Sequence, residues 1–289
     1  SRYLSPHLAQ MFGTNSIEEF YANEIERVGP SGVLQVLSLG SGEASTEIAI
    51  ASILRERGRQ VIFHCTDISD GMNEAANLNA VNSGFPNEFK FYALDINQKF
   101  PQTDAQIVIA NHSLHHFVGL EFIFDKVLEQ ISDSGAFIVN DMIGRNGHQR
   151  WPEVHKLVNS FWKLIPHEKR IDRIHRVPKP VFEDFDCADG TFEGIRAEDI
   201  LPLCCDRFQF ERFLGFGGVP DIFLDRMYGG NFDTEGEFDI AFIDALEDVN
   251  SMLLVAGVIK PTAMFATMRK QARSEIFWPT RAQEAIRRP

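Results

Sequence analysis

Glycine, carboxylate and amide groups directly follow four apolar segments, in an order that suits a nucleoside-containing ligand. In chain order they are Gly40, Ser41 and Gly42, then Asp67, then Asp95, and last Asn111 with His112. Glycine lets a ligand approach bare backbone, one carboxylate can accept both ribose hydroxyls, and a second can accept the exocyclic amine of a base. The apolar Ile68 and Met72 could enclose the base ring. Alternatively, each aspartate by itself caps the helix that follows it.

The glycine turn argues against a dinucleotide as the ligand. Gly40 and Gly42 fit the first two positions of the G-x-G-x-x-G fingerprint, but Ser45 stands at the third. Glu43 also places a carboxylate at the start of the next helix, where a pyrophosphate would meet a negative charge. A cationic or zwitterionic ligand would not. The turn alone is equally well explained as a tight connection between a strand and a helix.

Seven apolar segments predict the strands that position these groups. They cover residues 33–39, 61–66, 89–94, 105–110, 135–140, 208–216 and 262–268. Helical patterns cover residues 6–12, 17–28, 44–57, 72–80, 122–131, 197–205 and 237–258. This alternation predicts an α/β fold: a Rossmann-like, doubly wound, seven-stranded and mostly parallel sheet with helices on both faces. Ligands of such sheets bind outside the carboxyl ends of the strands, so the four polar groups should meet at one edge.

The chain is expected to form one main domain with additions at both ends. Its 289 residues, 44% of them hydrophobic, are enough to bury a sizeable core. Residues 1–30 predict an N-terminal helical segment, 31–270 the main domain and 271–289 a polar C-terminal tail. Residues 145–190 interrupt the alternation of strands and helices, and predict a helical lid inserted after the fifth strand.

The composition excludes some partners and indicates a compartment. The net charge of -13 and the pI of about 5.1 argue against nucleic acid and anionic membranes, which bind through excess Lys and Arg. The four cysteines form no C-x-x-C or zinc-type spacing, so a reducing cytoplasm is expected. No secretory signal pattern is seen, and the apolar run Met252–Ile259 is too short to cross a bilayer. The oligomeric state stays open, and a homodimer is compatible with the sequence.

Four motifs resemble those of class I S-adenosylmethionine-dependent methyltransferases. They are Val36-Leu-Ser-Leu-Gly-Ser-Gly-Glu43, Thr66-Asp-Ile-Ser-Asp-Gly-Met72, Leu94-Asp-Ile96 and Asn111-His-Ser-Leu-His-His-Phe117. The resemblance covers roughly residues 30–145 and implies S-adenosyl-L-methionine as the cofactor. It implies these contacts: the methionine portion to Gly40, Ser41 and Gly42, the ribose to Asp67, the adenine to Asp95 and the Ile96 backbone, and the sulfonium to Asn111 and His112.

The sequence departs from the family pattern at two positions of the first motif. Ser38 stands where the family most often has an acidic residue, and Ala44 replaces a frequent third glycine. The contact that an acidic residue would make to the methionine amine is therefore assigned to Glu43 as a substitute.

Methyl transfer from a sulfonium is an in-line displacement in which the protein mainly aligns the acceptor and excludes water. A general base is needed only when the acceptor arrives protonated. The catalytic candidates are His112, His115 and Asp141 at the ends of the fourth and fifth strands, with His116 beside them. Alternatively, these histidines only pack and hydrogen-bond at the sheet edge. His112 and His115 lack a clear third ligand, so no metal site is expected.

The insertion after the fifth strand is the main indication of the substrate. Residues 145–179 contain nine basic and three acidic residues, a local excess of six positive charges. We therefore expect Arg145 and Arg150 to bind a carboxylate, phosphate or sulfate group, with Trp151 forming part of the pocket wall. The alternatives are a solvated helix face for the charges and simple docking of the lid for the tryptophan.

A small-molecule methyltransferase acting on oxygen or nitrogen is the leading prediction. A second is another S-adenosylmethionine-using enzyme, which cyclises the cofactor or transfers its aminocarboxypropyl arm. A third is a non-catalytic cofactor-binding module, and a nicotinamide dehydrogenase is fourth.

Overall fold

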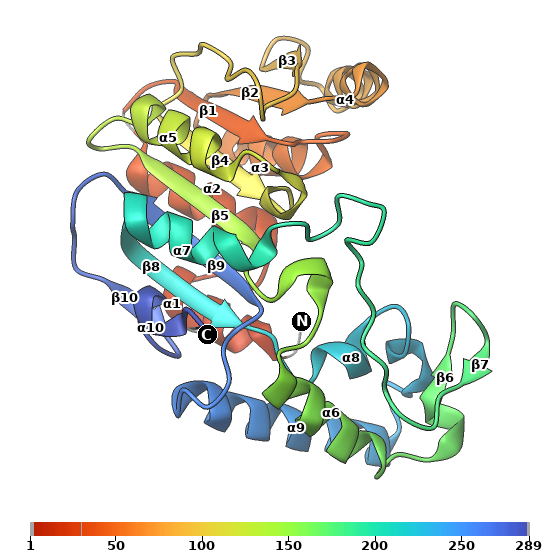
Figure 1. Ribbon diagram of the computed structural model, residues 1–289. Coiled ribbons are helices and arrows are strands. Elements are labelled where there is room, and N and C mark those ends of the chain that lie inside the picture. Colours follow the sequence, from red (N-terminus) through yellow and green to blue (C-terminus); the bar gives the residue numbers. More distant parts are fainter. Residues whose placement is uncertain (1–2, 30, 288–289) are drawn as a thin grey trace.

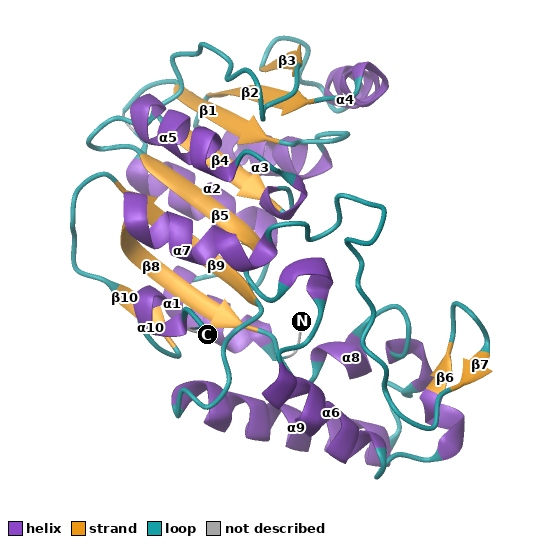
Figure 2. Ribbon diagram, viewed as in Figure 1, coloured by secondary structure: helices purple, strands orange, loops and turns teal. Residues whose placement is uncertain are grey.

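The computed structural model describes residues 3–29 and 31–287, and a mixed β-sheet lies at its centre (Figures 1 and 2). The strands of this sheet are β1 (Leu34–Leu39), β2 (Val61–Asp67), β3 (Phe89–Ala93), β4 (Ile107–Asn111), β5 (Ala136–Met142), β8 (Gln209–Phe216), β9 (Ala263–Arg269) and β10 (Ile276–Trp278). Their order is β10-β8-β9-β5-β4-β1-β2-β3, with β9 antiparallel to β5 and β8. The order reverses between β1 and β4, which is where such sheets bind ligands.

The predicted fold class is confirmed, with one strand more than the seven expected. The eighth strand, β10, lies in the segment expected to be a polar tail and pairs in parallel with β8. It has only three residues, and two of them, Ile276 and Phe277, are exposed, so it carries no long apolar signal. Residues 1, 2, 30, 288 and 289 of the predicted terminal segments lie outside the described residues.

Helices cover both faces of the sheet. In Figure 1, α1 (Leu4–Phe12), α2 (Ile17–Val28) and α3 (Ser45–Glu56) lie behind it, and α5 (Leu120–Gln130) and α7 (Ala197–Arg207) lie in front. Helix α10 (Ala282–Ala285) shares the core of the front face, and α4 (Asp70–Asn82) packs beside β2 and β3. Each face therefore has its own hydrophobic core.

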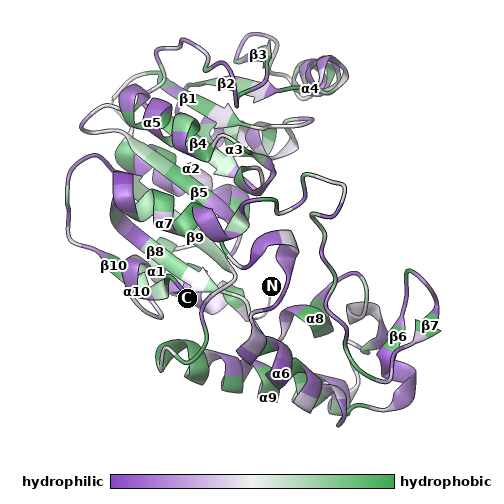
Figure 3. Cartoon of the chain, in the orientation of Figure 1, coloured by the Kyte–Doolittle hydropathy of each residue, from purple (hydrophilic) through white to green (hydrophobic). Residues whose placement is uncertain are grey.

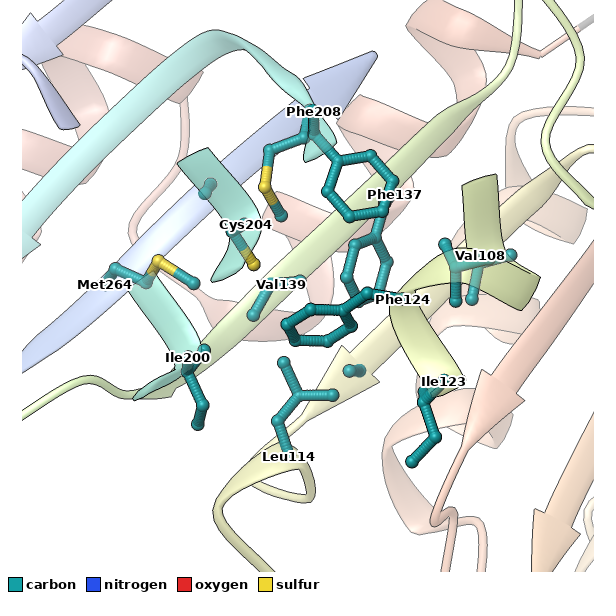
Figure 4. Close-up of a cluster of buried hydrophobic side chains, with 14 of the residues drawn as sticks. Val108, Leu114, Ile123, Phe124, Phe137, Val139, Ile200, Cys204, Phe208 and Met264 are labelled. Carbon is teal, nitrogen blue, oxygen red and sulfur yellow. The ribbon is translucent and has the colours of Figure 1, made fainter. Parts of the chain in front are cut away.

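Strand β5 shows how one strand serves both cores. Phe137 and Val139 point to the front core, whereas Ala136 and Ile138 point to the back one, because successive side chains alternate across a strand. Hydropathy follows this burial, and β4 and β5 are mainly hydrophobic along their length (Figure 3). Figure 4 shows Phe137 in the front core together with Leu114, which anchors the turn after β4.

The turn from β1 to α3 is tied to the neighbouring strand and to the helix it begins. Gly40 has φ +68°, and a Cβ atom there would lie 2.8 Å from Cβ of Ser113, so glycine is required. The Gly40 N–H donates to Oγ1 of Thr66 at 3.3 Å. Ser38 at the end of β1 donates its hydroxyl to the buried carboxyl of Glu47 on α3, at 2.6 Å.

A helical cap lies beyond the carboxyl ends of β5 and β8 (Figure 1). It consists of α6 (Pro152–Trp162), the hairpin β6–β7 (Ile171–Asp172 and Val177–Pro178), α8 (Asp221–Leu224) and α9 (Glu237–Val255). Trp162 at its centre is fully buried against Phe182, Phe223 and Tyr228. The cap thus combines the predicted lid with a second insertion, between β8 and β9, which follows it in the chain.

The buried Glu47 makes stability depend on pH. Burial raises the pKa of Glu47, although the hydrogen bond from Ser38 opposes this. When folding raises the pKa of a carboxyl, the folded protein loses stability as the pH rises. The loss begins near the ordinary pKa of 4.5 and is complete above the pKa of the folded state. We predict that Glu47→Gln, which stays neutral, gains in free energy of unfolding relative to the wild type over this interval. Urea unfolding from about pH 4 to about pH 8 measures the gain.

The control is Glu43→Gln, because the Glu43 side chain is exposed at the start of the same helix. Its stability should run parallel to that of the wild type at every pH. A difference between Glu47→Gln and the wild type that does not change with pH would contradict the prediction.

Candidate functional site

A cavity of about 640 Å³ opens at the carboxyl ends of β1, β2 and β4, beside the loop that follows β3. Its lining residues are Gly40, Gly42, Thr66, Asp67, Ile68, Leu94, Asp95, Ile96, Asn97, Gln98, His112, Ser113, His116, Phe117, Val118 and Phe192. The structure therefore brings together seven of the ten residues that the sequence predicts around a nucleoside cofactor. The volume is in the range of small-molecule and cofactor sites.

The first two polar groups meet directly. The Gly42 N–H donates to Oδ2 of Asp67 at 3.1 Å, and the Ser69 N–H donates to Oδ1 at 2.9 Å. Asp67 thus supports both the glycine turn and the start of α4 while it lines the cavity. The N-cap of α4 is Ser69, whose hydroxyl accepts from the Met72 N–H, so the alternative that Asp67 only caps this helix is wrong.

Asp95 is held by residues that the sequence analysis did not single out. Asn97 donates from its backbone and its side-chain amide to Oδ1, at 3.0 and 2.8 Å, and Gln98 donates to Oδ2 at 2.7 Å. The side-chain bond from Asn97 is the main reason that the pKa of Asp95 is lowered. Oδ1 of Asn97 accepts from the N–H groups of Val118 and Gly119, both at 2.9 Å. Asn97 therefore links two walls of the cavity.

Three predicted cofactor residues do not line the cavity. The hydroxyl of Ser41 is buried and has no hydrogen-bond partner among the described residues, and Met72 is exposed on the first turn of α4. The side chain of Asn111 accepts from Asn140 at 2.9 Å and donates to Thr46 at 3.4 Å, which directs it toward α3. The cavity edge after β4 is formed instead by His112, whose φ of +49° is left-handed.

Two of the predicted catalytic residues, His115 and Asp141, form a buried pair. Nδ1 of His115 lies 2.5 Å from Oδ1 of Asp141. A carboxylate can only accept, so Nδ1 carries a proton, and in the neutral ring Nε2 has the free lone pair. Burial alone would lower the pKa of His115, but the hydrogen bond to Asp141 and the charges of Asp141 and Glu193 outweigh it and raise the pKa. Burial lowers the pKa of the third candidate, His112.

Two residues far along the chain join this pair, and the sequence analysis missed both. His148, in the 3₁₀ turn after β5, and Glu193, in the segment between the cap and α7, approach each other to 2.9 Å between Nε2 and Oε1. Nε2 of His115 lies 3.5 Å from the same oxygen. Both residues are far from His115 in the chain and belong to no motif. Apart from their residue types, the sequence therefore gives no indication that they join the site.

The basic residues of the insertion mostly bind the cap itself and do not line the main cavity. Lys169 pairs with Asp239 at 2.5 Å, Arg170 donates to the carbonyl of Ile165 at 2.7 Å, and Lys179 pairs with Glu183 at 3.0 Å. The excess positive charge counted along the sequence is therefore largely used within the fold.

Of the three predicted substrate residues, Arg145 and Arg150 lie near His148, and Trp151 lies elsewhere. Arg145 donates to the Arg150 carbonyl at 3.4 Å, and Arg150 donates to the His148 carbonyl. Trp151 lies away from the cavity. It packs under the guanidinium of Arg287 at 4.5 Å and lines a second cavity of about 380 Å³ beside α7.

The comparison with known protein families decides the assignment. The family model described as a methyltransferase domain matches residues 31–177, just over half of the chain. The protein belongs to the class I S-adenosylmethionine-dependent methyltransferases. The resemblance seen in the four motifs is thereby confirmed, and with it an enzyme whose methyl donor is S-adenosylmethionine. A search of curated proteins finds no match.

Solved structures share the fold of this methyltransferase at low identity. Geranyl diphosphate methyltransferase in complex with SAM has a TM-score of 0.50 at 11% identity, over 87% of this chain and 84% of that one. A putative sarcosine dimethylglycine methyltransferase from Galdieria sulphuraria has 0.49 at 14%, over 90% and 86%. Geranyl diphosphate C-methyltransferase from Streptomyces coelicolor A3(2) has 0.49 at 12%, over 88% and 80%. At these identities the likeness concerns the fold alone.

No helix in the described part of this methyltransferase is long and apolar enough to cross a membrane.

Removing the Asn97 side chain should destabilise the protein. Asn97→Ala leaves the N–H groups of Val118 and Gly119 without their acceptor, which costs about 1–3 kcal/mol. Urea unfolding measures the loss. The matched control is Asn77→Ala on the exposed face of α4, which should change stability by no more than about 0.5 kcal/mol. Equal stability of Asn97→Ala and the wild type would show that the link does not support the cavity wall.

Proposed function

We propose that this methyltransferase transfers the methyl group of S-adenosylmethionine to an oxygen or nitrogen atom of a small molecule. One observation carries the proposal: the cofactor-sized cavity at the carboxyl ends of β1, β2 and β4 adjoins a buried histidine–carboxylate pair. His116 and His112 line the cavity, and the ring centroid of His115 lies 4.1 Å and 6.2 Å from theirs. Donor and acceptor chemistry would then share one edge of the sheet.

The cavity residues divide among the parts of the cofactor. Asp67 accepts the ribose hydroxyls, since its carboxylate lines the cavity beside the backbone of Gly42. Asp95 and Ile96 receive the adenine, and the exposed side chain of Ile68 covers the ring. The methionine portion lies along the glycine turn. This places the sulfonium next to the turn that carries His112.

The acceptor is activated on the His115 side of this edge. A hydroxyl or ammonium acceptor has to lose a proton, and the free lone pair of Nε2 on His115 can take it. Asp141 holds the imidazole in the tautomer that exposes Nε2. The side chain of Glu193 is 44% exposed, so the cluster meets solvent on that side.

An anionic group on the acceptor fits the surroundings of His148. Nε of Arg150 is buried, and among the described residues it has no hydrogen-bond partner. A buried, unpaired guanidinium nitrogen is costly unless a ligand satisfies it. Arg145 donates to the carbonyl of Arg150 and would help to hold it. We therefore keep Arg145 and Arg150 as the proposed anion contacts, with residues 145–190 as the lid that carries them, and propose docking of the cap for Trp151.

Cofactor binding tests the assignment of Asp67. Asp67→Asn removes the charge that strengthens hydrogen bonds to the ribose, so the affinity for S-adenosylmethionine should fall about 10–100-fold. Calorimetric titration with S-adenosylmethionine and S-adenosylhomocysteine measures the change. Asp70→Asn, three residues further on and exposed, is the matched control and should bind as the wild type does. Unchanged affinity in Asp67→Asn would move the ribose elsewhere.

Turnover tests the assignment of His115. With a methyl-labelled donor and a mixture of small hydroxy and amino acids, the wild type should form a labelled product and S-adenosylhomocysteine. His115→Ala should lower the rate about 10²–10⁴-fold while the donor affinity stays the same. His167→Ala, on the exposed surface of the cap, should react at the wild-type rate. Methylthioadenosine as the product would favour cyclisation or aminocarboxypropyl transfer, and donor binding with no product from any acceptor would indicate a binding module.

A further inference from the structure

Three side chains from separate turns converge beside the cofactor cavity as a set of metal ligands. They come from the turn after β4, the turn after β5 and the segment before α7. One ring nitrogen of His115, one ring nitrogen of His148 and a carboxylate oxygen of Glu193 all lie within 4.8 Å of one another. Oε1 of Glu193 is 2.9 Å from His148 and 3.5 Å from His115. Ligands about 2.0–2.2 Å from a tetrahedral zinc ion would lie about 3.3 Å apart, so these separations suit an ion.

The hydrogen bond behind His115 is the one that a metal-ligating histidine needs. His115 donates its Nδ1–H to the fully buried Asp141, which fixes the ring and directs Nε2 toward Glu193. Carboxylate–histidine–metal arrangements of this kind raise the basicity of the ligating nitrogen. Nδ1 of His148 is buried and has no partner among the described residues. With Nε2 of His148 free to bind, its Nδ1–H would be a buried donor without an acceptor, in contrast to that of His115.

The backbone holds the three turns together without any ligand. The Gly147 N–H donates to the Gly194 carbonyl at 2.9 Å, and the Ile195 N–H donates to the His115 carbonyl at 3.1 Å. Gly147 and His148 both have left-handed φ values, +63° and +54°. Left-handed backbone at a residue such as His148 is uncommon and occurs often at ligand sites. A Cβ atom at Gly194 would lie 3.0 Å from the His148 ring, so the glycine allows the close approach.

From this geometry we propose that His115, His148 and Glu193 bind one divalent transition-metal ion, with zinc as the best match to two imidazoles and a carboxylate. Three protein ligands leave a fourth tetrahedral position open, as in catalytic zinc sites. His112 and His115 alone, as a pair close in the sequence, predict no metal site. The ligands that complete the set are 33 and 78 residues beyond His115 in the chain.

The role of the ion rests on the proposed function. An acceptor hydroxyl bound at the open position would have its pKa lowered by the ion and would lose its proton to solvent or to a neighbouring imidazole. The alkoxide oxygen would then attack the methyl carbon as the bond from carbon to the sulfonium sulfur breaks, giving an ether and S-adenosylhomocysteine. In this form of the enzyme His115 is a ligand, and the ion activates the acceptor in its place. The substrate class narrows to hydroxyl compounds.

Zinc alone is the probe that tests the site. The full chain, dialysed against a chelator, should bind one equivalent of Zn²⁺ in calorimetry, and Co²⁺ should give the visible absorption of a tetrahedral site. His148→Ala and Glu193→Ala should lose this binding. Asp141→Asn keeps the ligands but changes the support of His115, so its zinc affinity should fall about 10–100-fold. His167→Ala, an exposed histidine outside the cluster, should bind as the wild type does.

The possible results distinguish a failure of the metal site from a failure of the proposed methyltransferase function. Circular dichroism first shows that each variant is folded; Glu193 lies on a partly exposed loop, so its variant is the safer of the two. No bound zinc in the wild type, or one equivalent retained in both His148→Ala and Glu193→Ala, would overturn the proposal. Titration of the same samples with S-adenosylmethionine reports on the methyltransferase function independently, because the donor cavity contains none of the three ligands.

Discussion

One buried carboxylate, that of Asp141, determines how the central strands end at the proposed site. Its side chain is fully buried and accepts hydrogen bonds from the N–H groups of Ser113 and Leu114, at 2.9 and 2.8 Å, and from the His115 ring. Burial alone would raise the pKa of Asp141, but the hydrogen bond and charge of His115 and the Leu114 N–H lower it. A buried charge left unpaired costs several kcal/mol. The turn after β4 therefore has to direct its N–H groups at Asp141, and this fixes the orientation of the His115 ring.

The helical cap positions the segment that carries Phe192 and Glu193. Its aromatic core around Trp162 joins two insertions, one after β5 and one between β8 and β9, and so fixes where the chain leaves the cap. From there the chain returns to α7 along residues 183–196 (Figure 1). Phe192 then closes the cofactor cavity, and Glu193 reaches the histidines. The packing of the cap thus determines where Phe192 and Glu193 lie at the edge of the sheet.

The sequence predicted the sheet and the donor side of the site because their signals are local. Apolar runs ending at Gly40, Asp67 and Asp95 mark parallel strands, and the carboxyl ends of such strands meet by topology. It named His115 and Asp141 as separate candidates for the same reason, since both follow neighbouring strands, but their pairing is seen only in the structure. His148 and Glu193 could not be placed, because their approach depends on the packing of the cap. The charge count along the lid did not show which basic residues are paired within the cap, such as Lys169 with Asp239.

A crystal structure with S-adenosylmethionine bound would show whether one sheet edge aligns the methyl donor with the histidine cluster. We predict the ribose on Asp67, the adenine beside Asp95 and the methyl group directed toward the turn that carries His112 and His115. A cofactor bound away from the β1–β4 edge, or bound there with its methyl group directed away from these histidines, would contradict this prediction.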